Sequence, residues 1–135
     1  MSKTLAIIKP DAVEARKIGL IVNRLEEEGF RLLAAKHTQL DDSEAGEFYA
    51  VHLERPFYEP LKKFMTSGPV LVLALEREDA VAHLRRVIGA TDPAEAEPGT
   101  IRALYAESKE RNAIHASDSD ETAKQEIAFF FPALA

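Results

Sequence analysis

The chain of 135 residues contains no cysteine and no long hydrophobic run. Without cysteine it can form no disulfide, use no thiolate nucleophile and build no cysteine-based zinc site. Its apolar stretches fall far short of the ~20 residues that a membrane-spanning helix needs, so we expect no membrane partner. Residues 1–4 lead directly into an apolar segment and lack the layout of a secretory signal, so we expect a cytoplasmic location.

Several signatures of nucleotide enzymes and hydrolases are also missing. The sequence has no GxxxxGK[ST] phosphate loop and no GxGxxG dinucleotide fingerprint. It has neither HExxH nor a serine-elbow motif. Any phosphate chemistry in this chain must therefore use another arrangement of residues.

Positive charge is the scarcer sign: 17 Lys and Arg face 23 Asp and Glu, for a formal net charge of −6. A general nucleic-acid binder would have a basic balance, so we do not expect nucleic acid as the main partner. Net charge describes the whole surface whereas a site is local, so phosphate-bearing substrates remain open. The length, with 46% hydrophobic and 30% charged residues, predicts one folded domain over residues 1–135.

Short apolar segments alternate with amphipathic ones along the chain. The β-like segments predict strands over residues 4–9, 30–40, 70–75 and 112–115. Capping residues and apolar spacing predict helices over residues 11–28, 41–52, 57–65, 79–88 and 118–129, with a short element over 100–105. Because residues 70–75 are apolar without interruption, this strand is predicted to be buried on both faces.

This order of elements favours an α/β (α+β) fold of the ferredoxin-like βαββαβ class. We expect a four-stranded antiparallel sheet with the helices packed on one of its faces. A flavodoxin-like parallel sheet is the alternative, although it would require a fifth strand.

His115 is the outstanding candidate for chemistry. It follows a predicted strand and lies just ahead of a helix N-terminus, where free amide groups favour anions. Histidine can act as a nucleophile, and Glu126, about two turns along the next helix, could bond one ring nitrogen and leave the other free. A histidine that is merely satisfied in a turn is the structural alternative.

Other polar and aromatic residues are weaker candidates when each is taken alone. Lys9 ends an apolar strand directly before Pro10, where it could meet an anion or simply be solvated. Ordinary surface, capping or core roles would explain each of the remaining candidates: Tyr49, Phe57, Arg85, Thr91 and Arg102.

Taken together, these segments resemble the nucleoside diphosphate kinase family. Residues 112–119, Asn-Ala-Ile-His-Ala-Ser-Asp-Ser, look like the family's active-site signature, Asn-x-x-His-Gly-Ser-Asp-Ser. Residues 4–13 are similar to its opening strand, and 55–58 with 64–70 are similar to its nucleotide clamp. Residues 89–102 resemble its loop and phosphate-binding run. Several motifs in the right order make the resemblance specific.

The resemblance implies an enzyme that moves the γ-phosphate of a nucleoside triphosphate to a nucleoside diphosphate in a ping-pong cycle. The substrates would include ATP, GTP and their deoxy forms, with Mg²⁺ held mainly by the nucleotide phosphates and not directly by the protein. His115 would take the phosphoryl group, Glu126 and Ser117 would orient its ring, and Tyr49 would lie near it. The resemblance also implies a homo-oligomer built from dimers.

The same resemblance implies a set of nucleotide contacts. The phosphates would be held by Lys9, Arg85, Thr91 and Arg102, the sugar by Lys9 and Asn112, and the base by Phe57 and Leu61. Stacking on a base without reading its edges implies low base specificity.

Position 116 departs from the family pattern, because Ala stands where Gly is usual. If the backbone needed a positive φ there, Ala would be strained, but we expect it to be tolerated. The residues alone also leave open a non-catalytic ferredoxin-like module that binds an anion or a partner. Only the enzyme requires His115.

Overall fold

The computed structural model describes residues 1–134, and its centre is a four-stranded antiparallel sheet. The strands lie in the order β2-β3-β1-β4 and span Ser2–Ile8 (β1), Arg31–Thr38 (β2), Val70–Arg77 (β3) and Ile114–Ala116 (β4). Strand β1 pairs antiparallel with β3 on one side and with β4 on the other. This arrangement confirms the ferredoxin-like prediction, and the parallel alternative is wrong.

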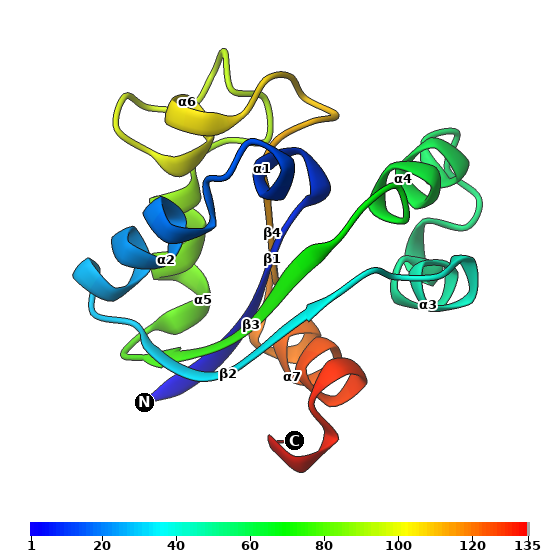
Figure 1. Ribbon diagram of the computed structural model, residues 1–135. Coiled ribbons are helices and arrows are strands. Elements are labelled where there is room, and N and C mark those ends of the chain that lie inside the picture. The colour runs from blue at the N-terminus through cyan, green and yellow to red at the C-terminus, as the bar shows by residue number, and fades with distance from the viewer. Residues whose placement is uncertain (135) are drawn as a thin grey trace.

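Helices connect the strands and cover the sheet (Figure 1). They are α1 (Pro10–Glu14), α2 (Ile18–Glu27), α3 (Asp42–Phe48), α4 (Tyr58–Met65), α5 (Ala80–Ile88), α6 (Ile101–Tyr105) and α7 (Asp120–Phe130), with 3₁₀ turns at Ala50–His52 and Pro132–Leu134. Within residues 1–134, no helix is long and apolar enough to cross a membrane.

The helices cover both faces of the sheet, so the expectation of one covered face is wrong. Helices α2 and α5 lie on one side, and α3, α4 and α7 lie on the other (Figure 1). Along β1, Ala6 and Ile8 join the first core while Leu5 and Ile7 join the second. Because side chains alternate across a strand, a strand that is apolar throughout needs cover on both sides. The prediction that 70–75 is such a strand is confirmed.

The helix predicted over residues 11–28 is in fact two helices, α1 and α2. Arg16 has a φ of 62°, which interrupts the helical path between them. The expected cap at Asp11 is also wrong. Helix α1 starts one residue earlier, at Pro10, and the Asp11 carboxylate instead accepts a bond from the distant Ala113 N–H at 3.0 Å.

The end of β1 meets the start of β4, and this junction positions the residues of the candidate site. Ile7 pairs with His115 in the sheet, and the Lys9 N–H donates to the Ala113 carbonyl at 2.8 Å. Directly after β4, Ser119 caps α7 in a reciprocal capping box with Thr122, in place of the predicted cap at Asp118. Residues from the beginning and from near the end of the sequence therefore lie side by side where β1 pairs with β4.

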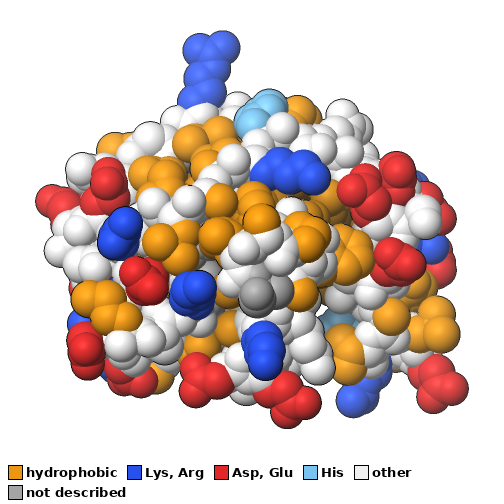
Figure 2. Space-filling model, turned by 90° about the horizontal axis from the view of Figure 1, so that it is seen from below, with side chains coloured by type: hydrophobic (Ala, Val, Ile, Leu, Met, Phe, Trp, Pro, Cys, Tyr) orange, Lys and Arg blue, Asp and Glu red, His pale blue; other side chains and the backbone are white. Residues whose placement is uncertain are grey.

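Charge is dispersed over the face that carries α7. Acidic and basic side chains are interspersed there, with hydrophobic side chains exposed between them (Figure 2). On this face the acidic excess therefore forms no single patch.

Candidate active site

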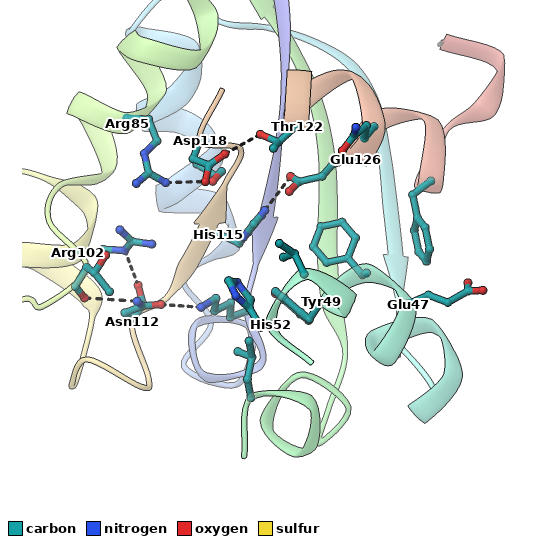
Figure 3. A pocket seen from close by; sticks show the side chains of 18 residues that line it. Glu47, Tyr49, His52, Arg85, Arg102, Asn112, His115, Asp118, Thr122 and Glu126 are labelled. Atoms are coloured by element: carbon teal, nitrogen blue, oxygen red, sulfur yellow. Dashed lines mark hydrogen bonds and ion pairs between the residues drawn. The ribbon is translucent and has the colours of Figure 1, made fainter. Parts of the chain in front are cut away.

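A cavity of about 560 Å³ opens beside the junction of β1 and β4 (Figure 3). Side chains from the end of β1, from α3 and the following turn, and from α4 to α7 contribute to its wall. The volume lies within the range of small-molecule sites. The cavity is lined by Lys9, Tyr49, Leu61, Arg85, Thr91, Arg102, Asn112, His115 and Glu126, which are nine of the candidates from the sequence.

His115 is bonded through one ring nitrogen only. Its Nε2 lies 2.9 Å from Oε1 of Glu126, and the Ser117 hydroxyl donates to the same oxygen at 2.8 Å. A carboxylate accepts hydrogen bonds, so in the neutral imidazole Nε2 carries the proton and Nδ1 carries the free lone pair. Nδ1 has no hydrogen-bond partner among residues 1–134.

Helix α7 and strand β4 together create this arrangement. The three-residue strand β4 carries His115, and α7 begins within five residues of it, so the helix returns Glu126 over the imidazole. The Ser117 N–H donates to the Leu5 carbonyl at 3.1 Å. This bond attaches the short segment between β4 and α7 to β1.

Two aromatic rings pack edge-on against the imidazole. The ring centroids of Phe48 and Tyr49 lie 5.3 and 6.1 Å from that of His115. Burial, with a smaller contribution from the charge of Glu126, raises the pKa of the Tyr49 phenol, so it stays protonated. Its hydroxyl has no hydrogen-bond partner among the described residues. These rings limit the rotation of the imidazole.

A chain of hydrogen bonds links Lys9, Asn112 and Thr91. The Lys9 ammonium donates to Oδ1 of Asn112 at 2.8 Å, and the Asn112 amide donates to the Thr91 carbonyl at 3.4 Å. Burial and repulsion by Arg102 lower the pKa of Lys9 to about 8, while the Asp11 carboxylate raises it. Lys9 is therefore a buried cation that stays mostly protonated at neutral pH.

Arg102 organises the backbone beside Asn112. Its guanidinium donates to the carbonyls of Asn112, Gly89 and Ile114 at 3.4, 3.0 and 2.7 Å. Burial lowers its pKa to about 10, with a further contribution from the charge of Arg85. A guanidinium has five N–H donors, so two remain for a ligand.

Arg85 and Asp118 lie beside Arg102 at the cavity wall (Figure 3). Arg85 is exposed and donates to the Ala116 carbonyl at 3.1 Å. Asp118 is held by the Thr122 hydroxyl at 2.8 Å. Three cations therefore surround a cavity in a chain whose net charge is negative.

Of the two residues expected to contact the base, the structure places one in the cavity wall and the other outside it. Leu61 of α4 lines the cavity, whereas Phe57 lies outside its immediate wall. The Phe57 ring is 48% exposed and packs against His52, with ring centroids 5.0 Å apart. It is thus an exposed aromatic surface at the rim.

Several cavity residues were not singled out from the sequence. Phe48 and His52 lie close to Tyr49 in the sequence and also line the cavity. Their nearness to a candidate aromatic residue was the one sequence feature that could have indicated them. Asp118 falls inside the 112–119 motif but was interpreted there only as a helix cap. Its position in the wall depends on β4 and α7 meeting at an angle, which local sequence does not show.

Ala116 is accommodated without strain. It belongs to β4, its φ is not positive, and its side chain is buried in the core beside α5. The Ala in place of the usual Gly is therefore compatible with the strand.

Comparison with known proteins identifies the family to which the fold belongs. The family model described as "Nucleoside diphosphate kinase" matches residues 2–135. A nucleoside diphosphate kinase from Nitratiruptor sp. is 58% identical over 97% of this chain and 96% of its own length. One from Dechloromonas aromatica is 55% identical over 99% of this chain and 94% of its own length.

Solved structures show the same likeness. The Aquifex aeolicus nucleoside diphosphate kinase superposes with a TM-score of 0.97 and 48% identity, over 98% of this chain and 96% of that one. A halophilic nucleoside diphosphate kinase from Halobacterium salinarum, in complex with CDP, superposes with a TM-score of 0.93 and 41% identity, over 96% of this chain and 87% of that one.

The fold, the cationic cavity and these relatives define an enzyme of the phosphotransferase class. The chain belongs to the nucleoside diphosphate kinase family. A non-catalytic binding module, the alternative left open by the residues alone, is therefore wrong.

Proposed function

We propose that this chain transfers the γ-phosphate of a nucleoside triphosphate to a nucleoside diphosphate through a phosphohistidine at His115. The observation that supports this proposal is the contact of Nε2 with Glu126 at 2.9 Å, because in the neutral imidazole it leaves the lone pair on Nδ1. The Nδ1 lone pair forms a bond to the γ-phosphorus as the bond to the bridging oxygen breaks. The first nucleoside diphosphate then leaves with the electron pair of that bond.

Glu126 supports this step electrostatically. When Nδ1 becomes phosphorylated while Nε2 keeps its proton, the ring acquires positive charge. The carboxylate, with Ser117 bonded to the same oxygen, faces that charge. A second nucleoside diphosphate accepts the phosphoryl group by the reverse reaction, which makes the cycle ping-pong.

The cations of the cavity would hold the phosphates. Lys9, Arg85 and Arg102 come from three distant segments and line one cavity, with Thr91 beside them. Phosphoryl transfer depends mainly on positioning and on neutralising charge, which this arrangement provides. Asn112, bonded to Lys9, would bind the sugar.

Mg²⁺ is the expected cofactor, and it would neutralise phosphate charge when bound. Among residues 1–134 no group of three or more His, Asp or Glu side chains could hold a metal ion. Glu126 is already engaged by His115 and Ser117. This donor set fits an ion that enters on the nucleotide phosphates.

The base would stack on Phe57, with Leu61 beside it. Phe57 is half exposed at the rim, and Leu61 lines the cavity nearby. A stacked base is held by its face, so we propose low base specificity, with ATP, GTP and deoxy forms as substrates.

We also propose a homo-oligomer built from dimers. Strand β2 is an outer strand of the sheet, and Leu32 on it and Leu20 on α2 are 40% and 50% exposed. An open strand edge beside apolar side chains is a surface that a second copy can cover. Light scattering would test this, and a monomer at micromolar concentration would contradict it. The single domain over residues 1–135 and the cytoplasmic location stay predictions.

A two-step labelling experiment tests the proposed reaction. We expect γ-labelled ATP with Mg²⁺ to leave acid-labile, base-stable label on the chain, and added nucleoside diphosphate to remove it. His115→Ala should take no label, whereas His37→Ala, an exposed histidine on β2, should label normally. Equal labelling of His115→Ala and wild type would contradict the proposal.

A further inference from the structure

Asp11 is a buried carboxylate that the proposed reaction does not use. It lies in α1 and is only 4% exposed. Its Oδ2 accepts a bond from the Ala113 N–H at 3.0 Å, across 102 residues of sequence. Its Oδ1 is buried and has no hydrogen-bond partner among residues 1–134. Burying an incompletely bonded carboxylate is costly, which suggests that the charge has a use.

The partner of Asp11 is a strained turn. Ala113 has a φ of 74°, which is unfavourable for a residue with a Cβ. The Ile114 N–H bonds back to the Asn112 carbonyl at 2.9 Å and so closes a three-residue turn around Ala113. Such conformations persist only where the surroundings hold them.

Both polar groups of Ala113 are held by the first turn of α1. Asp11 accepts from its N–H, and the Lys9 N–H donates to its carbonyl at 2.8 Å. Arg102 holds the carbonyls of the two neighbouring residues, Asn112 and Ile114. The turn is therefore clamped between α1 on one side and α6 on the other.

This turn lies between the phosphate-facing cations and the nucleophile. It directs Asn112 toward Lys9, and two residues later the chain carries His115 into β4. A shift of the turn would move both Asn112 and His115 relative to a bound nucleotide.

The charge of Asp11 also acts on the cations around it. It raises the pKa of Lys9 against the effects of burial and of Arg102 from α6. The hydrogen bond from Arg111 to Glu107 is the main reason that the pKa of Arg111, in the loop before β4, is raised, and the charges of Asp11 and Glu14 add to it. Arg85 of α5 faces Arg102 rather than Lys9. Asp11 is the negative group that favours protonated Lys9.

We propose that Asp11 is a positioning residue, which holds the strained Ala113 turn and balances the buried Lys9 charge so that Asn112, Lys9 and His115 face the same phosphates. This inference rests on the proposed function. It assigns to Asp11 two separable effects, one of geometry and one of charge.

Two substitutions separate these effects. Asp11→Asn keeps an acceptor for the Ala113 N–H but removes the charge, whereas Asp11→Ala removes both. At pH 6.5 we expect Asp11→Asn to lose less than about tenfold in phosphoryl uptake from labelled ATP. Asp11→Ala should lose about 10²-fold, because a small displacement of reacting groups is enough for such a loss. In Asp11→Asn the alkaline fall of kcat/KM should also move to lower pH.

Glu14→Gln is the matched control, because Glu14 is exposed on the same helix and loses the same charge. Its uptake rate and pH profile should equal those of the wild type. If Asp11→Ala fails to fold, the pH profile of Asp11→Asn still tests the charge effect, and the failure to fold itself shows that the Ala113 N–H needs its acceptor. An unchanged alkaline limb in Asp11→Asn would overturn the charge effect, and uptake at the wild-type rate by a folded Asp11→Ala would overturn the geometric one.

The failure of this inference is distinguishable from failure of the proposed reaction. A wild-type chain that takes no label would overturn the reaction and the role of Asp11 together. A wild type that labels normally, beside Asp11 variants that behave like it, would overturn only the role of Asp11.

Discussion

The imidazole of His115 and the carboxylate of Glu126 form one contact, with Nε2 and Oε1 2.9 Å apart. Ser117 bonds to the same carboxylate oxygen, so the ring is held from one side and open on the other. In the proposed reaction this pair would fix which nitrogen reacts, and the cations around it would hold the phosphates.

Removing the charge of Glu126 should slow the chemical step. Glu126→Gln retains an acceptor for Nε2 but no longer balances the charge that develops on the ring. We expect uptake of the phosphoryl group to fall by about 10–100-fold, the equivalent of a charged hydrogen bond. Rapid-quench labelling would measure this.

Glu121→Gln is the control for Glu126, because Glu121 is exposed on the same helix. It should label at the wild-type rate. If Glu126→Gln also labels at that rate with an unchanged melting temperature, Glu126 has no part in the reaction.

Removing the Phe57 ring should weaken nucleotide binding. If the base stacks on it, Phe57→Ala costs about 1–3 kcal/mol of binding free energy. The loss should be similar for adenine and guanine nucleotides, and calorimetry would measure it. Leu53→Ala, which removes another exposed apolar side chain of this segment, should bind normally. Equal dissociation constants for Phe57→Ala and wild type would remove Phe57 from the site.

Lys9 should make activity and stability respond to pH in opposite directions. Its pKa is about 8 in the folded chain against an ordinary value of 10.5, mainly because it is buried. Above pH 8 it loses the charge that would hold phosphate, so kcat/KM, which reports the free enzyme, should fall.

The lowered pKa of Lys9 has the opposite effect on the stability of the fold. Between pH 8 and 10.5 the unfolded chain binds more protons at Lys9 than the folded chain. The contribution of this group to the free energy of unfolding therefore rises with pH across that window. Denaturation of wild type and Lys9→Met at several pH values would show it. A difference between the two that stays constant from pH 7 to 10 would contradict it.

Arg102 should matter for folding as well as for activity. Arg102→Ala removes the guanidinium from three backbone carbonyls, one of which, that of Asn112, also accepts from the Ile114 N–H. We expect the free energy of unfolding to fall by about 2–4 kcal/mol. Arg85 is exposed and makes one such bond, so Arg85→Ala should lower activity with little change in stability. Equal stability losses for the two variants in urea would contradict this difference.

The sequence predicted the sheet better than the turns that shape the site. Residues 70–75 lie within β3, because an unbroken apolar run leaves few alternatives. The breaks at Arg16 and Ala113 were missed, since both have a positive φ without being glycine. Their conformations depend on neighbouring structure and not on the residue type.

Asp11 shows the same limit for the site. Its spacing from Glu14 indicated a helix cap, but the carboxylate bonds to a residue 102 positions away. Local pattern cannot show a long-range contact of this kind. Most candidates of the site were singled out from the residues and joined by the family resemblance, and the convergence of nine of them on one cavity became visible only in the structure.

The identity of the phosphorylated nitrogen tests the proposed reaction most directly. Because Nε2 donates to Glu126, the phosphoryl group should be found on Nδ1 of His115. The wild-type chain would be phosphorylated with ATP and Mg²⁺ and kept at alkaline pH, and phosphorus–proton NMR would distinguish the two isomers. We predict the Nδ1 isomer alone. Phosphate on Nε2, or on a residue other than His115, would contradict the proposed mechanism.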